Sequence, residues 1–195
     1  DAIGFVFWPG SPRHVTPRAA RALAATIPPT VRRVGVFVDQ PMAEIEAAIS
    51  VAGLDIVQLH GHEPAEFARR IARPVWRAVH EGLTPGDVMG YPAVAFLIDG
   101  APVGTYGGAG IVPRDDRILA AGALGSLVLA GGLTATTVGP AVVRYRPYAV
   151  DVSSGVETAP GMKDHTLVRA FVAMVRQADR RRTRDAVAPP RVDRL

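Results

Sequence analysis

The sequence predicts an α/β fold, a (β/α)8 TIM barrel in which seven βα units are present and the first is lacking. Short apolar runs alternate strictly with amphipathic helical segments along the chain. The apolar runs are continuous, which is typical of parallel strands that helices bury on both faces. A closed barrel needs eight units, and the first apolar run begins almost at Asp1 with no helix ahead of it. We therefore expect one unit to be missing from the N-terminus.

Strands and helices are expected in a regular order. The strands are expected at residues 3–7, 34–38, 56–60, 75–79, 94–98, 126–130 and 148–152. The helices are expected at residues 17–27, 42–51, 63–72, 113–123, 134–144 and 164–175, with a short helix or turn at 84–90. Thr16 followed by Pro17 is typical of a helix N-terminus, and Asp164 is placed to cap the last helix.

The composition is that of an ordinary globular protein. The chain has 195 residues, 48% of them apolar, and a mean hydropathy of +0.17, which fits one domain with a sizeable core. No apolar run approaches the roughly 20 residues of a membrane helix, and no signal-peptide pattern is present. We expect a cytoplasmic protein with no membrane partner. The absence of cysteine excludes disulfides, thiolate zinc sites and a thiol nucleophile within these residues.

The positive charge is concentrated near the C-terminal end. Residues 176–195 hold seven Arg and three Asp, which accounts for the whole net charge of +4. Because the rest of the chain is neutral, it lacks the basic face of a nucleic-acid-binding protein, and we expect no nucleic-acid partner. The Arg-rich composition predicts a disordered tail at residues 178–195, beyond a barrel domain at residues 1–177.

Glycine and serine residues follow the last two predicted strands. Gly131 and Gly132 end one strand, and Ser153, Ser154 and Gly155 end the next. Free backbone N–H groups near a helix N-terminus favour an anion, and the loops after the last two strands of a barrel are where a phosphate site usually lies. Each loop alone fits an ordinary tight turn equally well. The two in consecutive units favour a phosphate site.

Carboxylates and a histidine also end predicted strands. Asp99, Asp151 and His60 hold such positions, and barrel enzymes carry their catalytic groups there. The alternatives are a turn role for Asp99 and a backbone-satisfied inward role for Asp151. His60 and His62 come nearest to a metal-binding pattern, but no third ligand accompanies them, so we expect no metal.

Seven strand-end peptides occur in the order found in one enzyme family. They are residues 4–15 (GFVFWPGSPRHV), 34–38 (VGVFV), 57–61 (VQLHG), 96–99 (FLID), 107–110 (GGAG), 129–133 (LAGGL) and 150–157 (VDVSSGVE). Together they resemble phosphoribosylanthranilate isomerase from Asp1 to about Val175. Each peptide alone is weak evidence for the family, whereas all seven in the family's order are specific evidence.

The resemblance implies an isomerase of tryptophan biosynthesis. Its reaction is the Amadori rearrangement of N-(5-phosphoribosyl)anthranilate to 1-(2-carboxyphenylamino)-1-deoxyribulose 5-phosphate, with no metal or organic cofactor. Asp99 matches the general acid; its pKa must rise above the usual ~3.9, or a small protonated fraction must act. Arg13 matches the arginine that binds the anthranilate carboxylate. Asp151 matches a second pocket carboxylate, and His60 is expected to line the same pocket.

Two features of the resemblance concern missing or altered groups. Gly107, Gly108 and Gly110 resemble the family's mobile lid loop, although Ala109 stands where Ser or Thr is usual. The family's general base is a cysteine in a Lys-Ile-Cys-Gly motif on the first strand, and this sequence contains neither. We therefore expect the chain as given to fold poorly and to be inactive. The completed protein, with a phosphorylated small molecule as substrate, is expected to be a monomer or a homodimer.

Two other interpretations remain open. Another phosphate-binding barrel enzyme, of the indole-glycerol-phosphate synthase or thiamine phosphate synthase type, would share the two glycine loops. It would not predict residues 11–13 (SPR) together with residues 96–99 (FLID). The second interpretation is a degenerate barrel retained for binding or assembly, which would carry another residue at the cysteine position.

Overall fold

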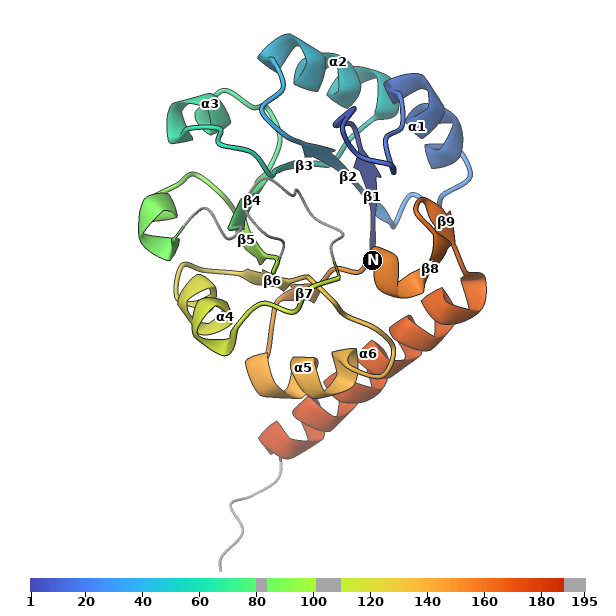
Figure 1. The fold of residues 1–195 in the computed structure, drawn as a ribbon, viewed down its shortest axis with the longest axis vertical. Coiled ribbons are helices and arrows are strands. Elements are labelled where there is room, and N and C mark those ends of the chain that lie inside the picture. The colour runs from blue at the N-terminus through green and yellow to red at the C-terminus, as the bar shows by residue number, and fades with distance from the viewer. Residues whose placement is uncertain (80–83, 101–109, 188–195) are drawn as a thin grey trace, which may run out of the picture.

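The computed structural model describes residues 1–79, 84–100 and 110–187. Its centre is one sheet of seven parallel strands, in which each strand is hydrogen-bonded to the next along the chain and the sheet curves into a ring (Figure 1). The strands are β1 (Ala2–Val6), β2 (Arg32–Phe37), β3 (Ile56–Leu59), β4 (Val75–Val79), β5 (Ala95–Ile98), β6 (Leu127–Leu129) and β7 (Ala149–Val150). The barrel-type α/β fold predicted from the alternating pattern is confirmed.

Helices surround the ring of strands on its outside (Figure 1). They are α1 (Pro17–Ala24), α2 (Met42–Ala52), α3 (Ala65–Arg69), α4 (Asp115–Gly122), α5 (Val138–Tyr145), α6 (His165–Val187) and the 3-10 helix η1 (Pro85–Val88). The Thr16 hydroxyl accepts a hydrogen bond from the Ala19 N–H at 3.2 Å, which caps α1 as predicted. Gly53, with φ of 66°, ends α2 in the left-handed conformation that glycine adopts readily.

Side chains alternate between the inside and the outside of the ring. Leu97 and Val128 belong to a small inner cluster, whereas their neighbours Phe96 and Leu129 belong to the large core under the helices. The register pairs Leu97 with Val128 and Ile98 with Leu129, so each face keeps its own set of side chains across adjacent strands. Where the last side chain of a strand faces the helices, the side chain of the next residue therefore points into the ring.

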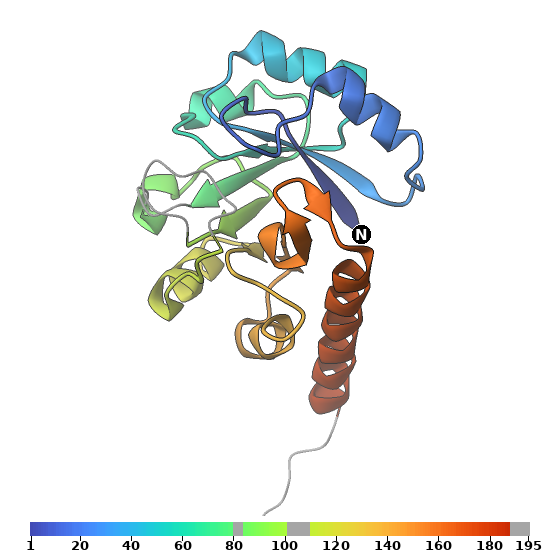
Figure 2. The ribbon, with the colours of Figure 1, turned by 45° about the vertical axis from the view of Figure 1, so that its right-hand side comes forward.

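The ring is open between β7 and β1 (Figure 1). Within the described residues, β2 is the only strand that pairs with β1, which also makes one isolated bridge between Val6 and His14, and β6 is the only strand that pairs with β7. Ala2, Ile3 and Gly4 of β1 are accordingly exposed. Both views show the short antiparallel hairpin of β8 (Glu157–Ala159) and β9 (Met162–Lys163) close to β1 (Figures 1 and 2). The alternating pattern did not predict this hairpin.

Helices α3 and α6 differ from the expected bounds because of tertiary contacts. Helix α3 begins only at Ala65 because Glu63 is drawn into hydrogen bonds with the backbone of neighbouring loops. Helix α6 continues past Gln177, the expected end of the barrel domain, to Val187. Ala178 is buried in the core, which favours helix where a tail was expected; residues 188–195 of that tail lie outside the described residues. No helix among the described residues has both the length and the apolar character needed to cross a membrane.

Candidate active site

Three titratable side chains point into the ring at the carboxyl ends of the strands. His60, Asp99 and Asp151 each directly follow the last, outward-facing residue of β3, β5 and β7, so the alternation of side chains turns them inward. Asp99 and His60 are buried, with 5% and 4% of their surface exposed. The structure thus places these three sequence-predicted residues at the same end of the ring.

His60 is oriented by a neighbour on its own strand. The Gln58 amide nitrogen lies 3.2 Å from His60 Nδ1. Which of the two groups donates depends on the tautomer of the His60 ring, and the contact holds the ring in place with either tautomer. His60 is therefore a fixed, inward-facing group rather than a freely turning one.

Asp151 lies at the open side of the ring. Desolvation by the surrounding protein raises the pKa of its carboxyl, while the charge of Lys163 and a hydrogen bond with the Val152 backbone lower the pKa by less. The side chain is nevertheless exposed to solvent, because β7 has no neighbour on that side within the described residues. Water at an exposed carboxyl screens such effects, so the exposure limits the rise of the pKa.

The two predicted phosphate loops touch each other. A Cβ atom at Gly155 would overlap the Leu133 carbonyl group, so only glycine allows the loop after β7 to pack this closely on the loop after β6. Gly131 and Gly132 have φ values of 82° and 60°, which also favour glycine. A Cβ atom at Gly131 would lie 3.1 Å from Asp99 Oδ1. The paired loops therefore lie directly beside the candidate acid.

These loops carry unused hydrogen-bond donors. Within the described part of the chain, the backbone N–H groups of Gly131, Gly132, Ser154 and Gly155 donate no hydrogen bond. Polar backbone groups that are left unpaired in a folded protein usually meet water or a ligand. Several N–H groups gathered at one place form a concavity suited to an anion. The geometry thus favours the phosphate interpretation over a pair of ordinary turns.

The predicted lid is described only at its C-terminal end. Gly107, Gly108 and Ala109 lie outside the described residues. A Cβ atom added to Gly110 would lie 3.6 Å from Ser154 Oγ, and one added to Gly132 would lie 2.8 Å from the Gly110 carbonyl oxygen. The segment therefore rejoins the described chain beside both phosphate loops.

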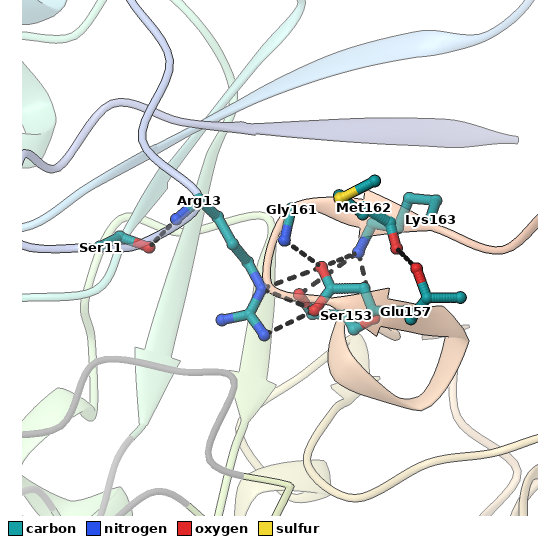
Figure 3. Close-up of polar contacts among 8 residues, drawn as sticks. Ser11, Arg13, Ser153, Glu157, Gly161, Met162 and Lys163 are labelled. Atoms are coloured by element: carbon teal, nitrogen blue, oxygen red, sulfur yellow. Dashed lines mark hydrogen bonds and ion pairs between the residues drawn. The ribbon is translucent and has the colours of Figure 1, made fainter.

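Arg13, in the loop after β1, is bound by Glu157 of β8 (Figure 3). Arg13 Nε lies 3.0 Å from Glu157 Oε1, and Arg13 Nη2 lies 2.7 Å from Oε2. The same carboxylate accepts hydrogen bonds from Lys163 Nζ at 2.8 Å and from the Gly161 N–H at 3.2 Å. Burial by itself raises the pKa of Glu157, but the hydrogen bonds and charges of Lys163 and Arg13 outweigh it and lower the pKa to about 2. Glu157 is thus ionised at neutral pH.

A buried ion pair fixes the loops that surround His60. Arg77 Nη1 lies 2.7 Å from Glu63 Oε2, with 3% and 2% of the two side chains exposed. The Gly61 N–H donates to Glu63 at 3.0 Å, and Arg77 Nη2 donates to the Gly61 carbonyl at 2.8 Å. The Asp39 N–H donates to the other oxygen of Glu63 at 2.8 Å. One ion pair therefore ties the loops after β2 and β3 to the body of β4.

Substituting Glu63→Gln should destabilise the protein strongly. The change leaves the Arg77 charge buried and without its partner, and breaking a buried pair from one side typically costs about 3–5 kcal/mol. The free energy of unfolding, measured by urea titration, reports the loss. Glu66→Gln is the matched control, because Glu66 pairs with Arg69 at an exposed site, where a pair contributes at most about 1 kcal/mol. Equal effects of the two substitutions would contradict the structural role given to Glu63.

No local sequence pattern pointed to a role for Glu157, Lys163, Glu63 or Arg77. Arg13 and Glu157 are separated by 144 residues along the chain, so neither predicts the other. Only their closeness in sequence to predicted site residues could have indicated two of them. Glu157 ends the strand-end peptide that contains the second predicted phosphate loop, and Glu63 follows closely after His60.

The fold defines a barrel-type α/β protein, and the strand-end groups form a candidate site at the carboxyl ends of the strands. Comparison with known proteins narrows this class. The family described as "N-(5'phosphoribosyl)anthranilate (PRA) isomerase" matches residues 1–174. The N-(5'-phosphoribosyl)anthranilate isomerase of Geobacter sulfurreducens is 45% identical, over 88% of this chain and 86% of the relative. The chain belongs to this isomerase family, as the resemblance predicted.

Solved structures agree with this assignment. The crystal structure of phosphoribosyl anthranilate isomerase from Thermus thermophilus matches with a TM-score of 0.81 and 38% identity, over 90% of this chain and 88% of that one. A second isomerase structure, in complex with reduced 1-(o-carboxyphenylamino)-1-deoxyribulose 5-phosphate, matches with a TM-score of 0.77 and 38% identity, over 91% and 88% of the two chains.

Proposed function

We propose that the complete protein, in which a further βα unit supplies the general base, catalyses the Amadori rearrangement of N-(5-phosphoribosyl)anthranilate in the tryptophan pathway of the cytoplasm. The observation that carries the proposal is the contact between two donor-bearing loops directly beside Asp99. This arrangement places a site for the substrate phosphate next to the acid Asp99. At the same end of the ring, Arg13 supplies a cation for the substrate carboxylate. Family membership supports this chemistry over that of the other phosphate-binding barrel enzymes.

The proposed chemistry has two proton-transfer stages. Asp99 protonates the ribose ring oxygen while the bond between that oxygen and C1 breaks, and the nitrogen lone pair forms a Schiff base. A general base then removes the C2 proton, which gives an enolamine that rearranges to the ketose product. Asp151 holds the ribose hydroxyls or assists proton transfer, and His60 lines the pocket. The N–H groups around Gly132 and Ser154 hold the 5′-phosphate throughout.

The base is proposed to lie on an eighth βα unit. Within the described residues, no strand lies on the outer edge of β1 or of β7, and Ile3 of β1 is 39% exposed, as expected of a strand that lacks a neighbouring strand. We infer that a unit placed ahead of β1 closes the ring and carries the cysteine that the family uses as base. The carboxyl end of its strand would lie beside Asp151. We call the chain with this added unit the eight-unit protein.

Turnover by the eight-unit protein tests the proposed function. The protein is incubated with N-(5-phosphoribosyl)anthranilate, and the ketose product is separated and identified by mass spectrometry. Product formation that depends on the protein supports the proposal. Binding of the product without any turnover would favour a degenerate barrel instead.

Arg13→Ala in the eight-unit protein should raise KM more than it lowers kcat. The substitution removes a charge-assisted hydrogen bond to the substrate carboxylate, worth about 1.5–3 kcal/mol or roughly 10–100-fold in KM. Steady-state kinetics separate the two constants. Arg69→Ala is the control, because the Arg69 side chain is 55% exposed and pairs with Glu66 on the surface. A fall in kcat at unchanged KM would contradict a binding role for Arg13.

A further inference from the structure

The guanidinium of Arg13 is occupied on one side and open on the other. Nε and Nη2 both bind the Glu157 carboxylate, while Nη1 makes no hydrogen bond with the described part of the chain. In Figure 3, Nη1 points away from Glu157. An arginine side chain has many rotamers, and a two-bond contact of this kind restricts them strongly. Glu157 thus determines the direction in which the remaining N–H donors point.

The charges of this cluster leave room for one anion. Arg13 and Lys163 carry two positive charges, and Glu157 carries one negative charge. These three side chains together have a net charge of +1. Because Lys163 also acts on the Asp151 carboxyl, the positive charge that remains for a ligand carboxylate is that of Arg13. Glu157 itself is saturated, because it accepts hydrogen bonds from Arg13, Lys163 and the Gly161 N–H.

The cluster also connects the two ends of the candidate site. Lys163 Nζ donates to the Ser153 carbonyl oxygen at 3.1 Å and lies 3.5 Å from Ser153 Oγ. Ser153 belongs to the loop with free N–H groups after β7, and Arg13 belongs to the loop after β1. A chain of polar contacts therefore runs from the proposed phosphate loop through Lys163 and Glu157 to Arg13 (Figure 3).

We propose that Glu157 is a positioning residue that aims Arg13 at the substrate carboxylate and so determines selectivity for the carboxylated aromatic ring. This inference rests on the proposed function and adds a residue to it. Glu157 touches neither the reacting atoms nor the substrate. Its effect passes through Arg13, and the contact of Lys163 with Ser153 holds Glu157 at a fixed distance from the phosphate loop.

The test compares two ligands in the eight-unit protein. One is reduced 1-(o-carboxyphenylamino)-1-deoxyribulose 5-phosphate, and the other is the same molecule without the carboxyl group. The ratio of their dissociation constants, measured by calorimetry, gives the carboxylate selectivity. Glu157→Gln should lower this selectivity about tenfold or more, because it removes the contact that directs a charge-assisted hydrogen bond at the carboxylate. The affinity for the ligand without the carboxyl group should change by less than about twofold.

The direction of the effect separates positioning from simple electrostatics. Glu157→Gln removes a negative charge near Arg13, so electrostatics alone would strengthen the binding of an anion. A loss of selectivity therefore supports positioning, while a gain or no change overturns the proposal. An equal weakening of both ligands also overturns it, since that is the result of a merely structural role for the hairpin. Glu66→Gln, at the exposed pair with Arg69, is the control that should leave both affinities unchanged.

A second substitution covers the case in which Glu157→Gln fails to fold. Arg13→Lys keeps the charge but lacks the planar fork that can bind Glu157 and a substrate carboxylate together. The proposal predicts that it also loses about tenfold in carboxylate selectivity, and retained selectivity would overturn the proposal. If the parent protein binds neither ligand, the proposed function itself fails. If the parent binds both and only the Glu157 effect is absent, the function stands and this inference fails.

Discussion

The eight-unit protein with Asp99→Asn should keep its fold and lose about 10²–10⁴-fold in kcat, the usual effect of removing a positioned acid. Asn has nearly the same shape as Asp, so the buried site beside Gly131 need not repack. An amide, however, cannot deliver a proton to the ribose ring oxygen. Ring opening would then depend on water, which the closely packed loops around Asp99 hinder.

The measurement is steady-state turnover together with binding of the reduced product analogue. Affinity for the analogue should change little, because the acid acts on the transition state more than on the bound ground state. Asp116→Asn is the matched control, since Asp116 is an exposed carboxylate on α4. Activity of the Asp99 variant within about threefold of the parent would remove Asp99 from the role of acid.

Two forms of the eight-unit protein, with cysteine or with serine at the position of the family's base, should both fold, and only the cysteine form should turn over. Serine preserves the size of the side chain and the closure of the ring. Its hydroxyl is a far weaker base than a thiolate, so a loss of about 10²–10⁴-fold in kcat is expected. Turnover assays and thermal unfolding of the two forms separate the chemical effect from the structural one.

The chain without the added unit should associate and unfold easily. The outer edges of β1 and β7, which have no neighbouring strand within the described residues, present backbone groups and apolar side chains that invite pairing with other chains. A deficit of a few kcal/mol is serious for a domain stable by only about 5–15 kcal/mol. Analytical ultracentrifugation and thermal unfolding report the outcome. A monomeric, cooperatively folded and active seven-unit chain would contradict the proposal of an eighth unit.

The barrel-type fold could be predicted because it depends on local patterns. Continuous apolar runs indicate parallel strands, and consecutive strands of such a sheet are neighbours, so the loops at Gly132 and Ser154 were expected to meet. The inward direction of Asp99 follows from the period of two in a strand, once the outward direction of Ile98 is known. These inferences need only the order of residues along the chain.

Contacts between distant segments could not be predicted in this way. The partner of Arg13 is Glu157, far away in sequence, on a hairpin too short to show a strand pattern. Glu63 was expected inside a helix, but hydrogen bonds from Gly61 and Asp39 hold it outside α3. Ala178 extends α6 because it is buried. In each case a tertiary contact outweighs the local preference.

A crystal structure of the eight-unit protein with reduced 1-(o-carboxyphenylamino)-1-deoxyribulose 5-phosphate tests the central claim most directly. The proposed site predicts that the phosphate lies between Gly131–Gly132 and Ser153–Gly155, bound by their free N–H groups, and that the carboxyl group lies at Arg13 Nη1. The ribulose chain should then pass beside Asp99. A phosphate bound beside Gly61, or a carboxyl group distant from Arg13, would contradict the site described here.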